Sequence, residues 1–125
     1  MSDYNPRTRY EHYYVRQARL EGRDELQHRY PDDFYVKPFR IAGNVYYIGN
    51  KAVCSHLIDT GAGLIVIDTS YPELDHLLIN SIWEAGFNPK DIKIVLHTHL
   101  HYDHFGATNT LTKIYGAKAY VGKDE

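Results

Sequence analysis

Three imidazoles and one carboxylate stand within six positions of this chain, at His99, His101, Asp103 and His104. A β-branched run at residues 92–96 precedes them, so they follow a predicted strand. His99 and His101 are two apart, and in an extended segment both rings face the same side and can reach one ion. Asp103 and His104 can reach a second ion after a bend in the loop. The alternative is a solvated, histidine-rich loop with incidental metal affinity, but the strand–loop–helix context favours a metal site.

The segments upstream of this loop predict an antiparallel meander. Short apolar runs at 45–48, 53–59 and 64–68 are separated by turns that contain glycine or asparagine. The third run is apolar without alternation, which predicts a strand buried on both faces.

A strand–helix–strand unit follows the meander. Thr69 or Ser70 is expected to cap the helix. Pro72 suits its first turn, and Gly86 is placed to end it. The next strand should lie parallel to the previous one, through a right-handed crossover. That strand is predicted at 92–96, and it is followed by a helix at about 106–115 and a strand at 119–121. These elements predict the α/β fold class.

Composition divides the chain at about residue 35. All seven arginines lie in the first 40 residues, whereas all seven lysines lie after residue 36. This break predicts an N-terminal extension, residues 1–35, joined to a different kind of domain at 38–125. Residues 7–29 have helical spacing, so the extension is expected to be helical. The net charge of -2 and the pI of about 6.4 argue against nucleic acid and membranes as partners.

Cys54 is the only cysteine, so no disulfide can form within the chain, which suits a reducing compartment. The polar N-terminus has no apolar signal-peptide core, and no apolar run approaches the ~20 residues of a membrane span. We therefore expect a soluble, cytoplasmic protein. The positions of Cys54 on a strand and of Trp83 on a helix face predict that both side chains lie in the core.

Two segments of the chain resemble the metallo-β-lactamase superfamily of metal-dependent hydrolases. Residues 98–106, THLHYDHFG, resemble its His-x-His-x-Asp-His signature. Residues 58–69, IDTGAGLIVIDT, resemble its strand–turn–strand, which ends in a supporting aspartate, here Asp68. The resemblance covers about residues 38–125. It implies the N-terminal half of an αββα sandwich, formed by the meander and the strand–helix–strand unit. The helical extension, which the resemblance does not cover, would precede this half.

The resemblance implies a role for each site residue. His99 and His101 would bind a first metal, and Asp103 and His104 would bind a second. Asp103 would also orient the attacking hydroxide or move a proton. Asp68 would hold the metal loop by accepting hydrogen bonds, although its position before a helix equally suits an anion at a helix N-terminus.

The implied cofactor is Zn²⁺, with two ions in the complete protein and iron or manganese as alternatives. The implied reaction is hydrolysis, in which a metal-bound hydroxide attacks an ester, lactone, thioester or β-lactam. The partner would be a small-molecule substrate.

The chain departs from the family in its number of ligands. The family also uses downstream histidines and an acidic residue, whereas the 21 residues after His104 contain no histidine. Two protein ligands remain for each metal, and a catalytic zinc normally has three. We therefore expect this chain alone to be inactive, with one apolar sheet face uncovered. It would act with a missing C-terminal half or as a homo-oligomer.

Three alternatives compete with a complete hydrolase. The first is a split, non-catalytic half that needs a partner segment, and the second is an iron-dependent redox member of the same fold. The third is a nucleic-acid-processing member, which the acidic balance disfavours. His97 lies just before the signature. It is either an additional ligand or, as the alternation of its strand favours, a packed or rim histidine.

Overall fold

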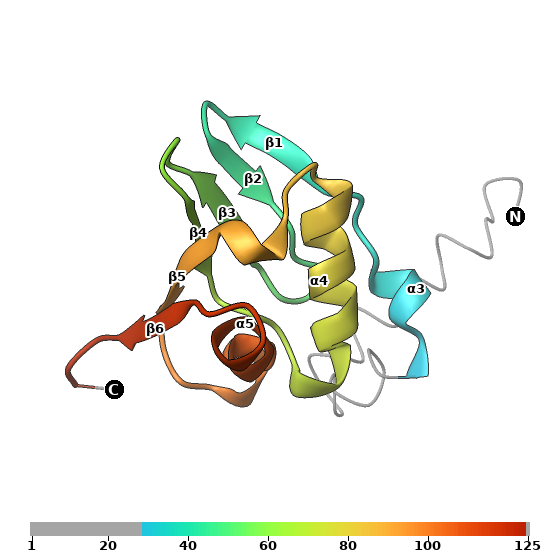
Figure 1. The fold of residues 1–125 in the computed structure, drawn as a ribbon. Coiled ribbons are helices and arrows are strands. Elements are labelled where there is room, and N and C mark those ends of the chain that lie inside the picture. Colours follow the sequence, from blue (N-terminus) through green and yellow to red (C-terminus); the bar gives the residue numbers. More distant parts are fainter. Residues whose placement is uncertain (1–28, 125) are drawn as a thin grey trace, which may run out of the picture. The chain divides into compact units, whose positions relative to one another are not determined.

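The computed structural model describes residues 29–124 (Figure 1). The chain divides into two compact units, Met1–Tyr35 and Val36–Glu125, which are described separately. The described part of the first unit holds one short helix, α3 (Pro31–Phe34). Pro31 stands in its first turn, where a fixed φ and a missing N–H are tolerated. The predicted helix over 7–29 falls, apart from Arg29, outside the described residues.

A six-stranded mixed sheet, in the order β1-β2-β3-β4-β5-β6, forms the second unit. The first four strands are antiparallel, and β4, β5 and β6 are parallel to one another. The α/β class, the meander and the parallel strand–helix–strand unit are thereby confirmed. The strands are β1 (Phe39–Ala42), β2 (Val45–Tyr47), β3 (His56–Asp59), β4 (Leu64–Ile67), β5 (Ile92–His97) and β6 (Lys118–Val121). The helices are η2 (Pro72–Leu74), α4 (Asp75–Glu84), η3 (Pro89–Asp91), η4 (Tyr102–His104) and α5 (Thr108–Lys113), where η marks a 3₁₀ helix.

Two strands differ from the prediction. Strand β1 was not predicted, and all four of its residues are exposed. It is defined by its antiparallel pairing with β2. Strand β3 is shorter than the predicted run at 53–59. The side chain of Asn50 accepts hydrogen bonds from the backbone N–H groups of Ala52 and Val53, at 2.9 and 2.8 Å. This local turn competes with strand formation just before β3.

The helices also begin differently from the prediction. Helix η2 starts at Pro72 without a side-chain cap, so the predicted caps at Thr69 and Ser70 are wrong. Gly86 follows the end of α4 with a φ of 93°, as a terminating glycine should.

Two predicted core residues lie at the surface. Trp83 is 53% exposed and Cys54 is also exposed, so the prediction that both lie in the core is wrong. No helix among residues 29–124 is long and apolar enough to cross a membrane.

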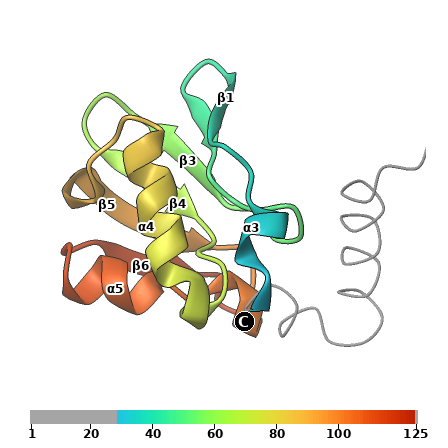
Figure 2. The same cartoon turned by 90° about the vertical axis from the view of Figure 1, so that its right-hand side faces the viewer.

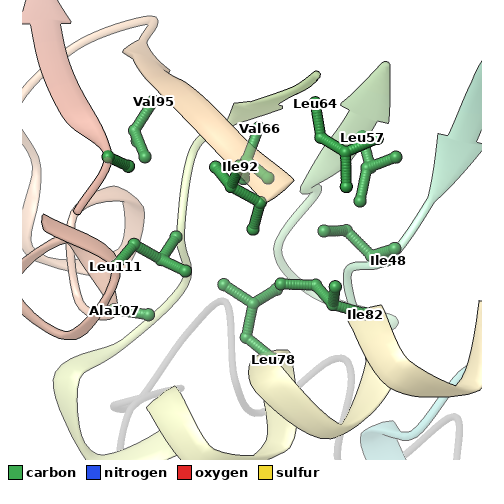
Figure 3. Close-up of a cluster of buried hydrophobic side chains, with 11 residues drawn as sticks. Ile48, Leu57, Leu64, Val66, Leu78, Ile82, Ile92, Val95, Ala107 and Leu111 are labelled. Carbon is green, nitrogen blue, oxygen red and sulfur yellow. The ribbon is translucent and has the colours of Figure 1, made fainter. Parts of the chain in front are cut away.

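Helices α4 and α5 cover one face of the sheet, as two perpendicular views show (Figures 1 and 2). The core lies between these layers (Figure 3). Leu57, Val66 and Val95 on the strands are fully buried there. Their partners from the helices are Leu78, Ile82 and Leu111. Burial of apolar area against two short helices is therefore the main force that holds this unit together.

The opposite face of the sheet is apolar and half-exposed. Ile65 and Ile67 of β4 point to this face and are only partly buried, so the prediction that β4 is buried on both faces is wrong. The strand register places one residue of each strand in a single row across this face. The row consists of Phe39, Tyr47, His56, Ile67, Leu96 and Tyr120, and we call it the open-face row. The expectation of an uncovered apolar face is confirmed by the exposure of Phe39, Leu96 and Tyr120.

Candidate metal centre

The predicted ligands follow the carboxyl end of β5. Because β4 and β5 are parallel, the residues after both strands emerge at the same edge of the sheet. The backbone N–H of Asp68 donates to the carbonyl of Leu96 at 2.9 Å, so the two strand ends are joined. The loop from Thr98 to Gly106, which we call the metal loop, begins there. Helix η4 lies within this loop.

Three side chains of the metal loop bring their donor atoms together. Ligand atoms of His99, His101 and Asp103 lie within 4.8 Å of one another. The rings of His99 and His101 are 4.4 Å apart between centroids and meet edge to face. Asp103 is buried, whereas His101 is exposed, so the cluster is anchored on one side and open on the other. Two imidazoles and a carboxylate form a donor set that suits zinc.

His104 completes the cluster from the other side. Its ring centroid lies 4.2 Å from that of His99. Its Nε2 lies 3.6 Å from Oδ1 of Asp103. Asp103 therefore lies close both to the His99–His101 pair and to His104, and one carboxylate can serve either side.

Asp68 lies beneath these ligands and is 4% exposed. Its φ of 61° is in the left-handed region, which aspartate tolerates better than most residues and which turns the chain at the end of β4. Its Oδ1 accepts from the backbone N–H of Thr98 at 2.9 Å. Its Oδ2 accepts from the Thr98 hydroxyl at 2.6 Å and from Nδ1 of His104 at 3.0 Å. Both oxygens are thus engaged, which suits a supporting role better than ligation.

These contacts determine which ring nitrogens carry protons. A carboxylate only accepts, so Nδ1 of His104 carries the proton and Nε2 keeps its lone pair for a metal. The single hydroxyl proton of Thr98 goes to Asp68, so Thr98 must accept from Nδ1 of His99, 2.8 Å away. Asp68 therefore sets both tautomers, directly for His104 and through Thr98 for His99. Thr98 was not identified as a site residue from the sequence.

The metal loop is held tightly against the β4–η2 connection. The backbone N–H of Gly106 donates to the carbonyl of Ser70 at 2.7 Å, and that of Thr69 donates to the carbonyl of His104 at 2.9 Å. A Cβ on Gly106 would collide with backbone atoms of Ser70, Tyr71 and Pro72. Only glycine fits this close approach, which explains the glycine that ends the signature.

The structure thus brings all five predicted site residues together. A second donor set, Asp68, His99 and His104, also lies within 4.8 Å, so Asp68 belongs to the same cluster. Neither donor set found among the described residues includes His97. Beside the loop lies a cavity of about 470 Å³. Its lining residues are Pro72, His97, Leu100, Phe105, Gly106, Thr108, Asn109, Ala119, Tyr120 and Val121.

The sequence profile of the metallo-beta-lactamase superfamily matches residues 42–125. The chain belongs to this superfamily. A 40-residue segment is 42% identical to a probable metallo-hydrolase of Methanocaldococcus jannaschii, over 32% of this chain and 20% of that protein.

The chain is similar in both sequence and fold to solved metallo-beta-lactamases, three of which are described next. The metallo-beta-lactamase GOB-18 of Elizabethkingia meningoseptica is 46% identical with a TM-score of 0.69, over 72% of this chain and 33% of that one. The subclass B3 enzyme BJP-1 of Bradyrhizobium japonicum is 36% identical with a TM-score of 0.66, over 67% and 32%. The class B3 di-zinc enzyme LRA-12 from an Alaskan soil metagenome is 44% identical with a TM-score of 0.65, over 67% and 32%. The chain therefore matches about a third of the length of these relatives.

Proposed function

We propose that this chain is the part of a zinc-dependent hydrolase that carries the metal loop, and that the substrate is a small ester, lactone, thioester or β-lactam. The observation that carries the proposal is the convergence of His99, His101, Asp103 and His104 over one buried carboxylate. The similarity to B3 metallo-beta-lactamases, one of them a di-zinc enzyme, supports the same chemistry.

The donor chemistry fits zinc. His99 and His104 each present an unprotonated Nε2, because their Nδ1 atoms donate to Thr98 and Asp68. Neutral imidazole and carboxylate are ligands that zinc prefers. A bound zinc ion would lower the pKa of a water molecule to about 7 and polarise the scissile carbonyl.

The residues of the chain have separate tasks in such a reaction. The metal ions would be held by His99, His101, Asp103 and His104. Asp68 and Thr98 keep the rings of His104 and His99 in the required tautomer. Asp103 would orient the attacking water and accept its proton. It is 5% exposed, so few water molecules compete for its oxygens.

Zinc titration of the 125-residue chain tests the proposal directly. Affinity is measured by competition with a chromogenic chelator, and bound metal by elemental analysis. We expect His99→Ala and Asp103→Ala to lower zinc affinity by more than the roughly 10–100-fold typical of a lost supporting partner. His76→Ala is the matched control, because this exposed histidine lies on α4, outside both donor sets. Unchanged affinity in both loop variants would refute the proposal, and bound iron would redirect it to redox chemistry.

Asp68→Asn tests the supporting role separately. Asparagine tolerates the positive φ of this position but offers only one accepting oxygen to partners that now use two. We expect zinc affinity to fall roughly 10–100-fold while the domain remains folded. An affinity equal to that of the unaltered chain would contradict the role.

We also propose that turnover needs ligands from a further segment of chain. The proposal is supported by the match to only about a third of the B3 enzymes and by the apolar open-face row. We expect the 125-residue chain to bind zinc but not to hydrolyse a chromogenic β-lactam, an aryl ester or a lactone. An active, soluble monomer of 125 residues would overturn this part.

A further inference from the structure

His97 is a buried histidine that the proposed reaction does not use. It is the last residue of β5, and its side chain is 4% exposed. It lies next to the metal loop in space but belongs to neither donor set. A buried imidazole needs partners for both nitrogens.

Both nitrogens of His97 have partners, and these partners determine its tautomer. Nδ1 lies 3.1 Å from the backbone carbonyl of His104, and Nε2 lies 3.0 Å from the hydroxyl of Thr108. A carbonyl only accepts, so Nδ1 carries the proton and Nε2 accepts from Thr108. The Thr108 oxygen in turn lies 2.9 Å from the hydroxyl of Thr69. The ring therefore links the metal loop to α5 and to the residue after Asp68.

We propose that His97 is a positioning residue for the metal centre, which acts by holding the backbone of His104. The ring of His104 is held by Asp68, and its carbonyl is held by His97 and by the N–H of Thr69. These contacts fix both ends of one residue, so the direction of its Nε2 is restricted. Pre-organised ligands of this kind lose less freedom when they bind a metal.

The geometry explains why a histidine suits this position. At this position one nitrogen must donate to the His104 carbonyl in the metal loop, and a second nitrogen across the ring must accept from the Thr108 hydroxyl of α5. An aliphatic residue could fill the volume but would supply neither hydrogen bond. The side-chain amide of asparagine places an N–H donor near the position of Nδ1. The longer side chain of glutamine places its amide nearer the position of Nε2.

The inference rests on the proposed function, but its first test needs no metal. Long-range ¹H–¹⁵N correlation spectra of the metal-free chain report the tautomer of each histidine. We expect His97 to carry its proton on Nδ1. A proton on Nε2 would overturn the inference whether or not the chain binds zinc, whereas absence of zinc binding with the expected tautomer would refute the proposed function instead.

The second test is a pair of substitutions read by zinc affinity. We expect His97→Gln to weaken zinc binding roughly 10–100-fold, and His97→Asn to stay within about threefold of the unaltered chain. His76→Gln and His76→Asn are the matched controls and should change nothing. Equal losses for the two His97 variants would indicate a packing role and overturn the inference, as would no loss in either.

A third variant keeps the test decisive if His97→Gln does not fold. Thr108→Val removes the partner of Nε2 and leaves Nδ1 facing the His104 carbonyl. We expect this variant to retain the Nδ1 proton of His97 and to bind zinc less than about tenfold more weakly. Loss of that tautomer would contradict the direct link between His97 and His104.

Discussion

The two faces of the sheet are built from the same strands and from similar apolar side chains, yet they differ in burial. On the face beneath α4 and α5, Leu57, Val66 and Val95 are completely buried. On the other face, Phe39, Leu96 and Tyr120 are 50%, 38% and 52% exposed. Adjacent residues of one strand, such as Val95 and Leu96, thus have opposite environments because side chains alternate across a sheet.

This difference shows that the sheet carries apolar surface for two layers, of which the described residues supply one. A strand such as β4 has apolar residues on both faces, as strands buried between two layers do. The B3 enzymes that the chain resembles are about three times as long as the matched part. The proposal that turnover needs a further segment of chain assigns the second layer to that segment, at the sheet edge where the metal centre lies.

The largest expected loss of folding stability comes from shortening a side chain on the covered face. Leu57→Ala should lower the free energy of unfolding by about 2–5 kcal/mol, because it leaves a cavity in the packed core. The neighbouring residue on the same strand, Ile58, points to the open face and is partly buried. Ile58→Ala should therefore cost about 1 kcal/mol. Urea unfolding of the 125-residue chain measures both.

Equal losses of unfolding free energy for Leu57→Ala and Ile58→Ala would contradict the difference in burial between the two faces. That outcome would mean that the open face is covered in solution, for instance by self-association. Repeating the unfolding at several protein concentrations distinguishes this case, because association makes the midpoint depend on concentration.

A smaller loss of folding stability is expected at Gly106, where the metal loop packs against the β4–η2 connection. Gly106→Ala adds one methyl group against the backbone of Ser70, Tyr71 and Pro72, where no space exists. We expect a loss of about 1–3 kcal/mol in unfolding free energy, together with weaker zinc binding because the loop must shift. Gly122→Ala is the matched control, since a Cβ there meets nothing within 4 Å. If Gly106→Ala were as stable as Gly122→Ala, the loop would not be held as tightly as its contacts imply.

The fold was predictable where local patterns decide it. Strands β2, β4, β5 and β6 match apolar runs, and Gly86 marks the end of a helix. Strand β1 was missed because its pairing with β2, rather than the pattern of its own four residues, defines it. The segment before β3 was mistaken for strand because the turn made by Asn50 depends on side-chain hydrogen bonds that periodicity does not reveal.

The candidate site was predictable only for residues that are close in sequence. His99, His101, Asp103 and His104 share one short motif, so their spacing alone predicts a cluster. The contacts of Asp68 with Thr98 and His104 span 30 and 36 residues and arise from the parallel pairing of β4 with β5. The resemblance supplied Asp68, but neither it nor the pattern identified Thr98 or the link from His97 to Thr108.

The smallest change in folding stability, but a clear change in association, is expected on the open face. Leu96 lies in the open-face row, and burying a leucine contributes about 1.5–3 kcal/mol, which is tenfold or more in affinity. Leu96→Lys should therefore weaken self-association of the 125-residue chain at least about tenfold, measured by sedimentation velocity, while unfolding changes by less than about 1 kcal/mol. Trp83→Lys removes an apolar side chain of α4, on the covered side, that is 53% exposed against 38% for Leu96, and should leave association unchanged. If Trp83→Lys reduced self-association and Leu96→Lys did not, the chain would associate through the outer surface of the helix layer and not through the open face.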